Sequence, residues 1–262
     1  MTTAPSADLA FAPEPARRNI VAVASGKGGV GKTWFSITLS HALAKAGQRT
    51  LLFDGDLGLA NVDVQLGVTP PRDLGMVMSG RFTMREAAWR YEPGGFDILA
   101  GRSGSGSLAT LPVSKLAALR QELQGLADTY DTVVVDLGAG IDRPVRMLAA
   151  EARSCLVVAT DEPTSITDAY AFIKVSAQER IAGDIRLVVN MASSPREGER
   201  TYGTLRKACR EFLKLDLSLA GIVRRDDKVK EAIRHQASLL TRHPNADAAV
   251  DVEAIARAVA RT

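Results

Sequence analysis

The chain alternates between short runs of consecutive apolar residues and longer segments in which apolar residues recur with a helical period. The short apolar runs occupy Asn19–Ser25, Arg49–Asp54, Phe96–Ala100, Thr132–Asp136, Ser154–Thr160, Ile185–Asn190 and Leu217–Val223. Strands that are apolar at every position, instead of at alternate positions, are typical of a parallel sheet with helices on both faces. The pattern therefore predicts buried strands in these places.

Helical patterns lie between the predicted strands. One runs from about Thr33 to Ala46 and ends before Gly47, a residue suited to closing a helix, and others cover Val113–Leu126 and Tyr170–Ile181. Alternation of strands and helices predicts a mostly parallel, twisted sheet with right-handed crossovers. The expected fold class is α/β, with helices on both faces of the sheet.

A single domain is expected over residues 19–262, because no internal repeat is present and Ser103–Ser107 is a flexible loop too short to link two domains. Residues 1–18 are rich in alanine and proline, which predicts a disordered N-terminal tail. Leu9 and Phe11 are apolar anchors within the tail, so a short partner-binding segment is the alternative.

No export signal or membrane span is expected. The N-terminus has no positively charged start followed by an apolar stretch, and the apolar runs are strand-sized, well below the roughly 20 residues that cross a bilayer. The expected location is the cytoplasm. A peripheral position at the inner face of the membrane or at a cell pole stays open.

Composition narrows the class of protein further. The 262 residues are 46% hydrophobic and 24% charged, as in ordinary globular proteins, and the net charge of +3 does not by itself indicate nucleic-acid binding. The cysteines are Cys155 and Cys209, which excludes a disulfide scaffold and predicts two buried core thiols. His41, His235 and His243 lack the spacing of zinc ligands, so no zinc site is expected.

The strongest chemical signal is the turn after the first strand, where Gly26–Thr33 reads GKGGVGKT and fits the phosphate-binding loop pattern. Glycines let backbone N–H groups close around phosphate oxygens, and the following helix N-terminus adds positive potential. Lys32 is predicted to neutralise the β- and γ-phosphates, and the Thr33 hydroxyl to ligate Mg²⁺. The predicted nucleotide-binding residues of this loop are Gly26, Gly28, Gly29, Val30, Gly31, Lys32 and Thr33.

Lys27 is a second lysine in this loop. Residues 27–33 read KGGVGKT, which resembles the deviant Walker A motif of the MinD/ParA ATPases. The resemblance implies a P-loop NTPase domain of the SIMIBI type that binds ATP and Mg²⁺. It also implies an ATP-dependent homodimer in which Lys27 is a catalytic residue that reaches the nucleotide of the partner. Fixed positive charge there would stabilise the transferring phosphoryl group.

Acidic residues end two of the predicted strands. Asp54 and Asp56 follow the strand Arg49–Asp54, and Asp136 ends the strand Thr132–Asp136 before a Gly-Ala-Gly turn. On the residues alone, polar turns after strands are the alternative interpretation. The family resemblance implies that Asp56 orients the attacking water, that Asp54 supports the metal shell and that Asp136 holds Mg²⁺.

Asn190 ends another strand, where an amide is well placed to read the edge of adenine. The resemblance implies this adenine contact. The basic residue that usually follows is Met191 here, and the usual Ile-Pro-x-Asp segment reads Val223–Asp226, with Arg224 at the proline position. These departures leave the preference for ATP over GTP open.

Two segments indicate the branch of the family. Asp56–Gly67 and Glu162–Lys174 resemble the FlhG/FleN (YlxH) ATPases, which control flagellar number and position. The resemblance extends over roughly residues 19–245. It implies a slow, dimerisation-coupled Mg-ATPase and, as partner, a FlhF-like SRP-type GTPase, a flagellar basal-body component or a transcription factor.

The same segment bears on Lys27. The resemblance implies that Glu162 or Asp168 contacts Lys27 of the partner protomer. Alternatively, or in addition, Thr164 or Ser165 caps a helix that begins there.

Two features depart from the flagellar branch. Residues 1–18 lack the DQAxxLR-type motif that activates FlhF, and Asp247–Thr262 lacks the bulky apolar residues of a membrane-targeting helix. The stripe of Val252, Ile255 and Val259 favours core packing over membrane contact.

A second class of function is carried as an alternative. A basic cluster consists of Arg224, Arg225, Lys228, Lys230 and Arg234, diluted by nearby acidic residues. A solvated face is the favoured interpretation; DNA or anionic lipid contact is the other. DNA contact would indicate a partition or division-site ATPase of the ParA or MipZ type. A scaffold that binds nucleotide without turnover is less favoured, because every expected catalytic position is filled.

Overall fold

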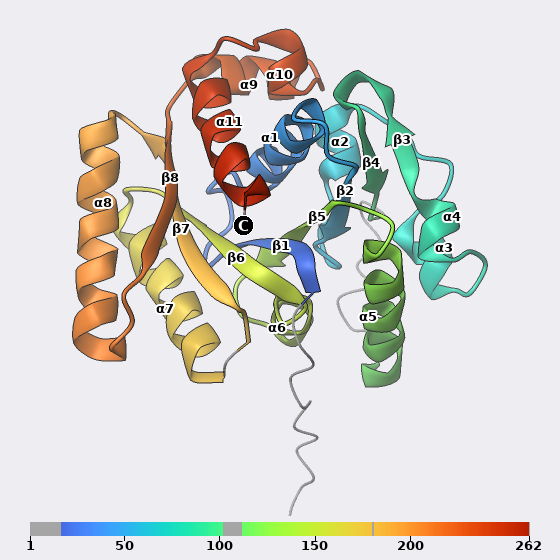
Figure 1. Cartoon of the computed structure of the whole chain (residues 1–262), viewed down its shortest axis with the longest axis horizontal. Coiled ribbons are helices and arrows are strands. Elements are labelled where there is room, and N and C mark those ends of the chain that lie inside the picture. Colours follow the sequence, from blue (N-terminus) through green and yellow to red (C-terminus); the bar gives the residue numbers. More distant parts are fainter. Residues whose placement is uncertain (1–16, 102–111, 180, 262) are drawn as a thin grey trace, which may run out of the picture.

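A twisted sheet of eight strands runs through the middle of the molecule, in the order β3-β4-β2-β5-β1-β6-β7-β8 (Figure 1). The strands are β1 Arg17–Ser25, β2 Thr50–Gly55, β3 Trp89–Tyr91, β4 Phe96–Leu99, β5 Thr132–Ala139, β6 Ala152–Ala159, β7 Asp184–Ala192 and β8 Ser218–Arg224. All neighbours pair in parallel except β3, which is antiparallel to β4. The sheet therefore confirms the predicted fold class.

The computed structural model describes residues 17–101, 112–179 and 181–261. The expected tail anchors Leu9 and Phe11 and the expected loop Ser103–Ser107 lie outside the described residues. The first strand begins at Arg17, so the boundary expected after residue 18 falls inside β1.

Helices cover both faces of the sheet (Figure 1). They are α1 Lys32–Lys45, α2 Val62–Leu66, α3 Leu74–Met78, α4 Met84–Ala87, α5 Val113–Ala127, α6 Arg143–Ala149, α7 Pro163–Glu179, α8 Pro195–Ala208, α9 Asp227–Arg234, α10 Leu239–Arg242 and α11 Asp247–Ala260, with a 3₁₀ turn η1 Glu92–Gly94 and a π-helical turn η2 Cys209–Leu213. One buried cluster lies under α3 to α8 and another under α1, α2, α9, α10 and α11. Burial on both faces explains why the strands are apolar at every position.

Several local expectations are confirmed and others change. Cys155 and Cys209 are buried and unpaired, as predicted. The helix predicted to start at Tyr170 begins already at Pro163, because proline is well tolerated in a first helical turn. The short helices α2 to α4 and the strand β3 are too brief to give a clear sequence period.

The last helix packs inward. Val252, Ile255 and Val259 are buried against α1 and β8, which confirms the predicted core stripe. Ile255 presses directly on the sheet, since a Cβ placed on Gly221 of β8 would lie 2.5 Å from the Ile255 side chain. Among the described residues, no helix is long and apolar enough to cross a membrane.

Candidate functional site

The candidate site forms where β1, β2 and β5 end side by side. The register pairs Val23 of β1 with Asp136 of β5, and Asp136 in turn with Asp54 of β2. Because all of these strands are parallel, their carboxyl ends and the loops that follow them gather at one edge of the sheet. The predicted phosphate loop and two of the predicted acids therefore meet, although they are far apart in the sequence.

The phosphate loop leaves β1 and leads straight into α1. The Ser25 hydroxyl donates a hydrogen bond of 2.8 Å to the Lys27 carbonyl, which turns the chain at the end of the strand. Gly29 and Gly31 have φ values of 81° and 88°, a left-handed conformation that glycine adopts without strain. Gly31 precedes α1 and makes no side-chain cap, so the first-turn N–H groups of α1 remain available to an anion.

Lys32 and Thr33 stand in the first turn of α1, beside the buried Asp136. Asp136 accepts a hydrogen bond of 2.9 Å from the Ser36 hydroxyl through Oδ1. Its Oδ2 is buried without a hydrogen-bond partner in the described chain. Burial raises the pKa of Asp136, while the nearby Lys32, Thr33 and Ser36 act in the opposite direction.

This donor set fits Mg²⁺. Mg²⁺ at nucleotide sites usually takes one or two protein oxygens and completes its shell with phosphates and water, so a dedicated cluster of acids is not required. The unsatisfied Oδ2 of Asp136 calls for a partner, since buried polar atoms are rarely left without one. Thr33 and Asp136 are thus suited to hold the ion, and no group of three or more histidine, cysteine or acidic residues in the described ranges offers another metal site.

Asp54 lies next to Asp136 but is engaged by its own chain. Its Oδ1 accepts from the Asp56 amide at 3.3 Å, and its Oδ2 accepts from the amides of Asn61 and Val62 at 3.0 and 3.1 Å. Burial, and then the neighbouring Asp136, raise the pKa of Asp54 to about 8. The structure therefore favours Asp54 as a support that orders the turn carrying Asp56, over direct coordination of a metal.

Asp56 lies in that turn, half-buried, and its Oδ1 accepts hydrogen bonds from the Gly58 and Leu59 amides at 3.2 and 2.9 Å. It borders a hollow of about 260 Å³ between the segment after β2 and the segment after β5. The hollow is lined by Gly55, Asp56, Leu57, Gly58, Leu59, Gly138, Ala139, Asp142, Pro144 and Val145. Asp56 thus borders a hollow between two strand-end loops that has room for a water.

Lys27 stands at the rim of the loop, with its side chain 36% exposed. Its Nζ donates to Glu162 Oε2 at 2.8 Å and to Thr164 Oγ1 at 2.8 Å. Both acceptors belong to the same chain as Lys27. The proposed contact of Glu162 or Asp168 with Lys27 of a partner stays a prediction.

The N-terminal part of α7 also packs against the phosphate loop. A Cβ on Gly26 would lie 2.1 Å from the Asp168 carbonyl oxygen, so the loop rests directly on α7. The prediction that Thr164 or Ser165 caps this helix is wrong, because both lie inside a helix that begins at Pro163. The Ser165 hydroxyl instead accepts from the Thr160 amide at 3.0 Å, which closes the turn after β6.

Asn190 is buried at the end of β7 and contacts the phosphate loop. Its Nδ2 donates to the Val30 carbonyl at 2.8 Å, and the amide lies so close to Gly31 that a Cβ there would be 2.5 Å from Nδ2. Met191 follows with a φ of 57°, and its methyl group also approaches Gly31. The structure thus gives Asn190 a loop-ordering contact, and its role toward adenine stays a prediction.

The basic cluster is partly neutralised within the chain. Arg224 forms a two-pronged pair with Asp251 at 2.9 Å for each contact and a further ion pair with Asp247 at 2.8 Å. Lys228 pairs with Glu231 at 3.1 Å. Arg224 therefore links β8 to α11 and does not present its charge to solvent as a DNA-binding residue would.

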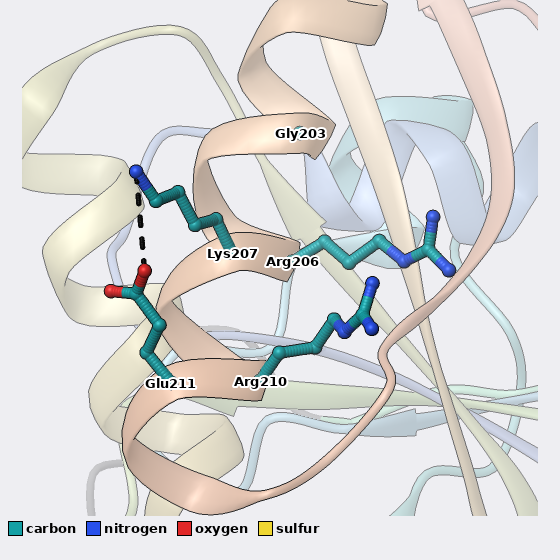
Figure 2. Close-up of a pocket in the computed structure, with 5 residues that line it drawn as sticks. All are labelled: Gly203, Arg206, Lys207, Arg210 and Glu211. Atoms are coloured by element: carbon teal, nitrogen blue, oxygen red, sulfur yellow. Dashed lines mark ion pairs between the residues drawn. The ribbon is translucent and has the colours of Figure 1, made fainter.

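A second hollow, of about 420 Å³, lies on α8 and η2, and its lining side chains are drawn in Figure 2. Arg206 and Arg210 project to one side of the helix, while Lys207 and Glu211 lie on the other as an ion pair of 3.9 Å (Figure 2). Arg206 is held by Asp216 at 2.8 Å. These charges largely satisfy one another, and we do not assign chemistry to this hollow.

Ser36 was not singled out from the sequence, and Thr164 and Arg225 were singled out for other roles, as a helix cap and as part of the basic cluster. Ser36 lies one helical turn after Lys32, so helical spacing could have placed it beside the strand-end acids. Thr164 accepts a hydrogen bond from Lys27, and the charge of Arg225 helps to lower the pKa of Glu162. These residues lie far apart in the sequence, and no local sequence pattern connects them.

Comparison with known proteins agrees with the geometry. The model of the CobQ/CobB/MinD/ParA nucleotide binding domain matches residues 21–239. The antiactivator FleN of Pseudomonas aeruginosa is 40% identical over 240 residues, covering 92% of this chain and 85% of FleN. The flagellum site-determining protein YlxH of Helicobacter pylori is 32% identical, covering 86% of this chain and 76% of YlxH. The resemblance predicted from the motifs is confirmed.

Solved structures show the same fold. MinD of Pyrococcus horikoshii, complexed with Mg-ADP, superposes with a TM-score of 0.77 at 22% identity, covering 92% of this chain and 95% of that one. MinD in the MinC:MinD complex of Aquifex aeolicus gives a TM-score of 0.75 at 23% identity, covering 93% and 96%. At these identities the likeness bears on the fold.

Proposed function

The chain belongs to the CobQ/CobB/MinD/ParA nucleotide-binding family, and from this premise we propose that it is a Mg²⁺-dependent ATPase that dimerises around ATP and acts as a switch in flagellar number or placement. One observation carries the enzymatic part. Oδ2 of Asp136 is buried and unsatisfied, and Lys32 and Thr33 of the first turn of α1, directly after a glycine-rich phosphate loop, act on this carboxyl group. That combination suits a bound Mg-nucleotide.

Nucleotide binding rests on the loop and α1. The amides of the loop and of the first turn of α1 contact the phosphates, Lys32 neutralises the terminal ones, and Thr33 and Asp136 hold Mg²⁺. The bound ion supplies charge neutralisation on the phosphates. Val30 and Gly31 keep their shape because Asn190 is hydrogen-bonded to the Val30 carbonyl.

Hydrolysis is assigned to Asp56 and Lys27. Asp56 orients the attacking water in the hollow between the two strand-end loops, and Asp54 holds the turn that carries it. Lys27 supplies positive charge to the nucleotide of a second copy of the chain, where it stabilises the transferring phosphoryl group. Because this contact exists only with ATP bound, the dimer forms in the ATP state and separates after hydrolysis, which is the differential affinity that a switch requires.

The flagellar role is supported by the identity to FleN and YlxH over most of the chain. FleN is named an antiactivator, which favours a transcription activator as one partner. A FlhF-like SRP-type GTPase or a basal-body component are the other partners to be tested. A DNA-partition role is less favoured, because Arg224 and Lys228 of the basic cluster are paired inside the chain.

The enzymatic part is tested by the mass of an Asp56→Ala protein in ATP and in ADP, measured by sedimentation. A dimer in ATP and a monomer in ADP are expected, and an added Lys27→Ala change should return the ATP sample to monomer. Phosphate release should be lost in Lys27→Ala while ATP binding persists. An Asp56→Ala protein that stays monomeric in saturating ATP and Mg²⁺ contradicts the proposal.

The cellular part is tested in the native host. Removal of the gene should change the number or position of flagella seen by electron microscopy, and the wild-type gene should restore them while Lys27→Ala should not. Unchanged flagella together with unstable inheritance of DNA would support the partition alternative instead.

A further inference from the structure

Lys27 is expected to act on the nucleotide of another protomer. In this structure it instead contacts the start of α7 in its own chain. The Lys27 ammonium has three donors, and Glu162 and Thr164 occupy two of them at 2.8 Å each. A lysine held in this way points at α7 of its own chain. It has to leave these acceptors before it can reach a phosphate on a facing protomer.

We propose that Glu162 and Thr164 form a self-inhibitory latch that holds Lys27 in the unpaired chain, and that Arg225 takes over Glu162 when Lys27 moves to the partner's nucleotide. This inference rests on the proposed function, and it deepens that function by naming what restrains dimerisation before ATP is shared.

A backbone contact holds the two parts of the latch, the phosphate loop and α7, next to each other. Gly26 precedes Lys27 and packs against the Asp168 carbonyl, so the loop that carries the lysine and the helix that carries its acceptors are held against each other. The acceptors lie at the very start of α7, which begins at Pro163. Release of Lys27 therefore breaks its two side-chain hydrogen bonds and leaves the contact of Gly26 with the Asp168 carbonyl in place.

The latch is also weak enough to open. Lys27 is 36% exposed and Glu162 62% exposed, and exposed ion pairs of this kind favour contact by no more than about fivefold. Attraction to a terminal phosphate with its several negative charges easily exceeds this preference. The latch therefore favours the contact of Lys27 with its own chain in the nucleotide-free state, and it still lets Lys27 leave when a phosphate is near.

Arg225 is the candidate to receive the carboxylate that Lys27 leaves, because it is the other cation whose charge acts on Glu162. Its backbone amide is anchored to the Ala192 carbonyl at 2.8 Å, and its charge helps Lys27 to lower the pKa of Glu162. In the described part of the chain Arg225 makes no ion pair of its own within 4 Å. Transfer of Glu162 to Arg225 would keep the Glu162 carboxylate paired after Lys27 has left it.

The first test is zero-length carbodiimide cross-linking of a mixture of ¹⁴N- and ¹⁵N-labelled Asp56→Ala protein, read by mass spectrometry. Without nucleotide, the Lys27–Glu162 amide should appear only between peptides of the same label, which marks a contact within one chain. Its yield should fall when ATP and Mg²⁺ form the dimer. Mixed-label pairs, absence of the product in the monomer, or an unchanged yield in the ATP dimer would overturn the latch.

The second test measures the ATP-dependent dimer affinity in the same Asp56→Ala background. Glu162→Gln should tighten the dimer about two- to fivefold, and Thr164→Val should act in the same direction with a smaller effect. Glu179→Gln is the matched control, since it removes a carboxylate from the other end of α7, where it pairs with Arg146. An unchanged or weaker dimer in Glu162→Gln would show that Glu162 is not a restraint.

The exchange is tested by a double-mutant cycle. Arg225→Ala should weaken the ATP dimer up to about fivefold when Glu162 is present and should have no effect in Glu162→Gln. Arg234→Ala controls for loss of a cation from the same cluster. Equal weakening in both backgrounds would mean that Arg225 touches the partner directly, which overturns the exchange.

Failure of the latch and failure of the proposed function give different results. A parent Asp56→Ala protein that never dimerises in ATP contradicts the proposed function and the latch with it. A parent that dimerises normally, with no tighter dimer in Glu162→Gln, contradicts the latch alone.

Discussion

At the scale of single residues, the site is shaped by hydrogen bonds that side chains make to distant segments. Ser36 is the main example, because its hydroxyl lies 2.9 Å from Asp136 Oδ1 and 3.0 Å from the Lys32 carbonyl, its two acceptors, while Oδ2 of Asp136 is buried without a partner in the described chain. A side chain that orients a metal-binding carboxylate commonly matters almost as much as the carboxylate itself.

We therefore predict that Ser36→Ala lowers the Mg²⁺ affinity of the nucleotide-bound protein about tenfold, because Asp136 loses the donor that fixes its orientation. Titration of Mg²⁺ against a fluorescent ATP analogue measures this. Ser40→Ala is the matched control: Ser40 is also buried in α1, but its hydroxyl donates to the Ser36 carbonyl at 2.8 Å. Equal losses in the two variants would mean that the effect is general loosening of α1.

Gly26 and Gly28 show how differently two glycines of one loop are constrained. A Cβ on Gly26 would collide with the Asp168 carbonyl at 2.1 Å, whereas a Cβ on Gly28 would meet nothing within 4 Å. We predict that Gly26→Ala lowers the free energy of unfolding of the nucleotide-free protein by about 1–3 kcal/mol. Gly28→Ala should change it by less than about 0.5 kcal/mol. Urea unfolding followed by circular dichroism compares them, and similar values for both would contradict the packing of the loop on α7.

At the scale of secondary-structure elements, α1 is held by contacts to several distant segments. It packs on α10 and α11, and its His41 makes a 2.7 Å hydrogen bond with Ser238, the residue before α10. Burial, and then the charge of Lys45, lower the pKa of His41 to about 4, although Glu253 opposes this. The α1–α10 contact therefore favours the neutral form of His41.

This gives a stability prediction with a defined sign. Between about pH 6.5 and pH 4 the unfolded state binds a proton at residue 41 that the folded state resists, so the free energy of unfolding falls as the pH drops through this window. The loss should be about 2–3 kcal/mol and absent above pH 6.5. Urea unfolding of wild type and His41→Gln across this range isolates the term, since the other titrating groups are shared.

The control for this prediction is His235→Gln, which alters an exposed histidine outside the core. It should keep the wild-type dependence on pH. A His41→Gln protein with the same acid sensitivity as wild type would contradict the assignment to His41.

At the scale of the whole molecule, the loops that gather at the ends of β1, β2 and β5 bring the phosphate loop, Asp56 and Lys27 to one edge of the sheet. If a second copy completes the site at that edge, folding stability becomes linked to protein concentration only in the ATP state, because a ligand or partner that binds the folded chain stabilises it by mass action.

We therefore predict that the Tm of the Asp56→Ala protein rises with protein concentration in ATP and Mg²⁺ but not in ADP and Mg²⁺. Differential scanning fluorimetry over a hundredfold range of concentration measures this. Lys27→Ala should keep the upward shift caused by nucleotide binding and lose the dependence on concentration. A concentration effect of equal size in ADP would point to association that does not involve the γ-phosphate.

The amino-acid sequence by itself determined the fold class, the phosphate loop and the family. These features are local: buried parallel strands are apolar at every position, and a loop that must close around phosphates needs glycines in a short run next to a lysine. The acids Asp54 and Asp136 and the amide Asn190 were recognisable for the same reason, because each ends an apolar strand.

Only the tertiary structure decided what those side chains touch. The sheet order places β5 between β2 and β1, so the partners of Asp136 come from segments about a hundred residues away and share no pattern with it. In the same way the acceptors of Lys27 lie on α7, Asn190 is hydrogen-bonded to Val30, and Arg224 is held by Asp251. Contacts of this kind follow from the packing of strands and helices that are not neighbours in the chain, which no local pattern encodes.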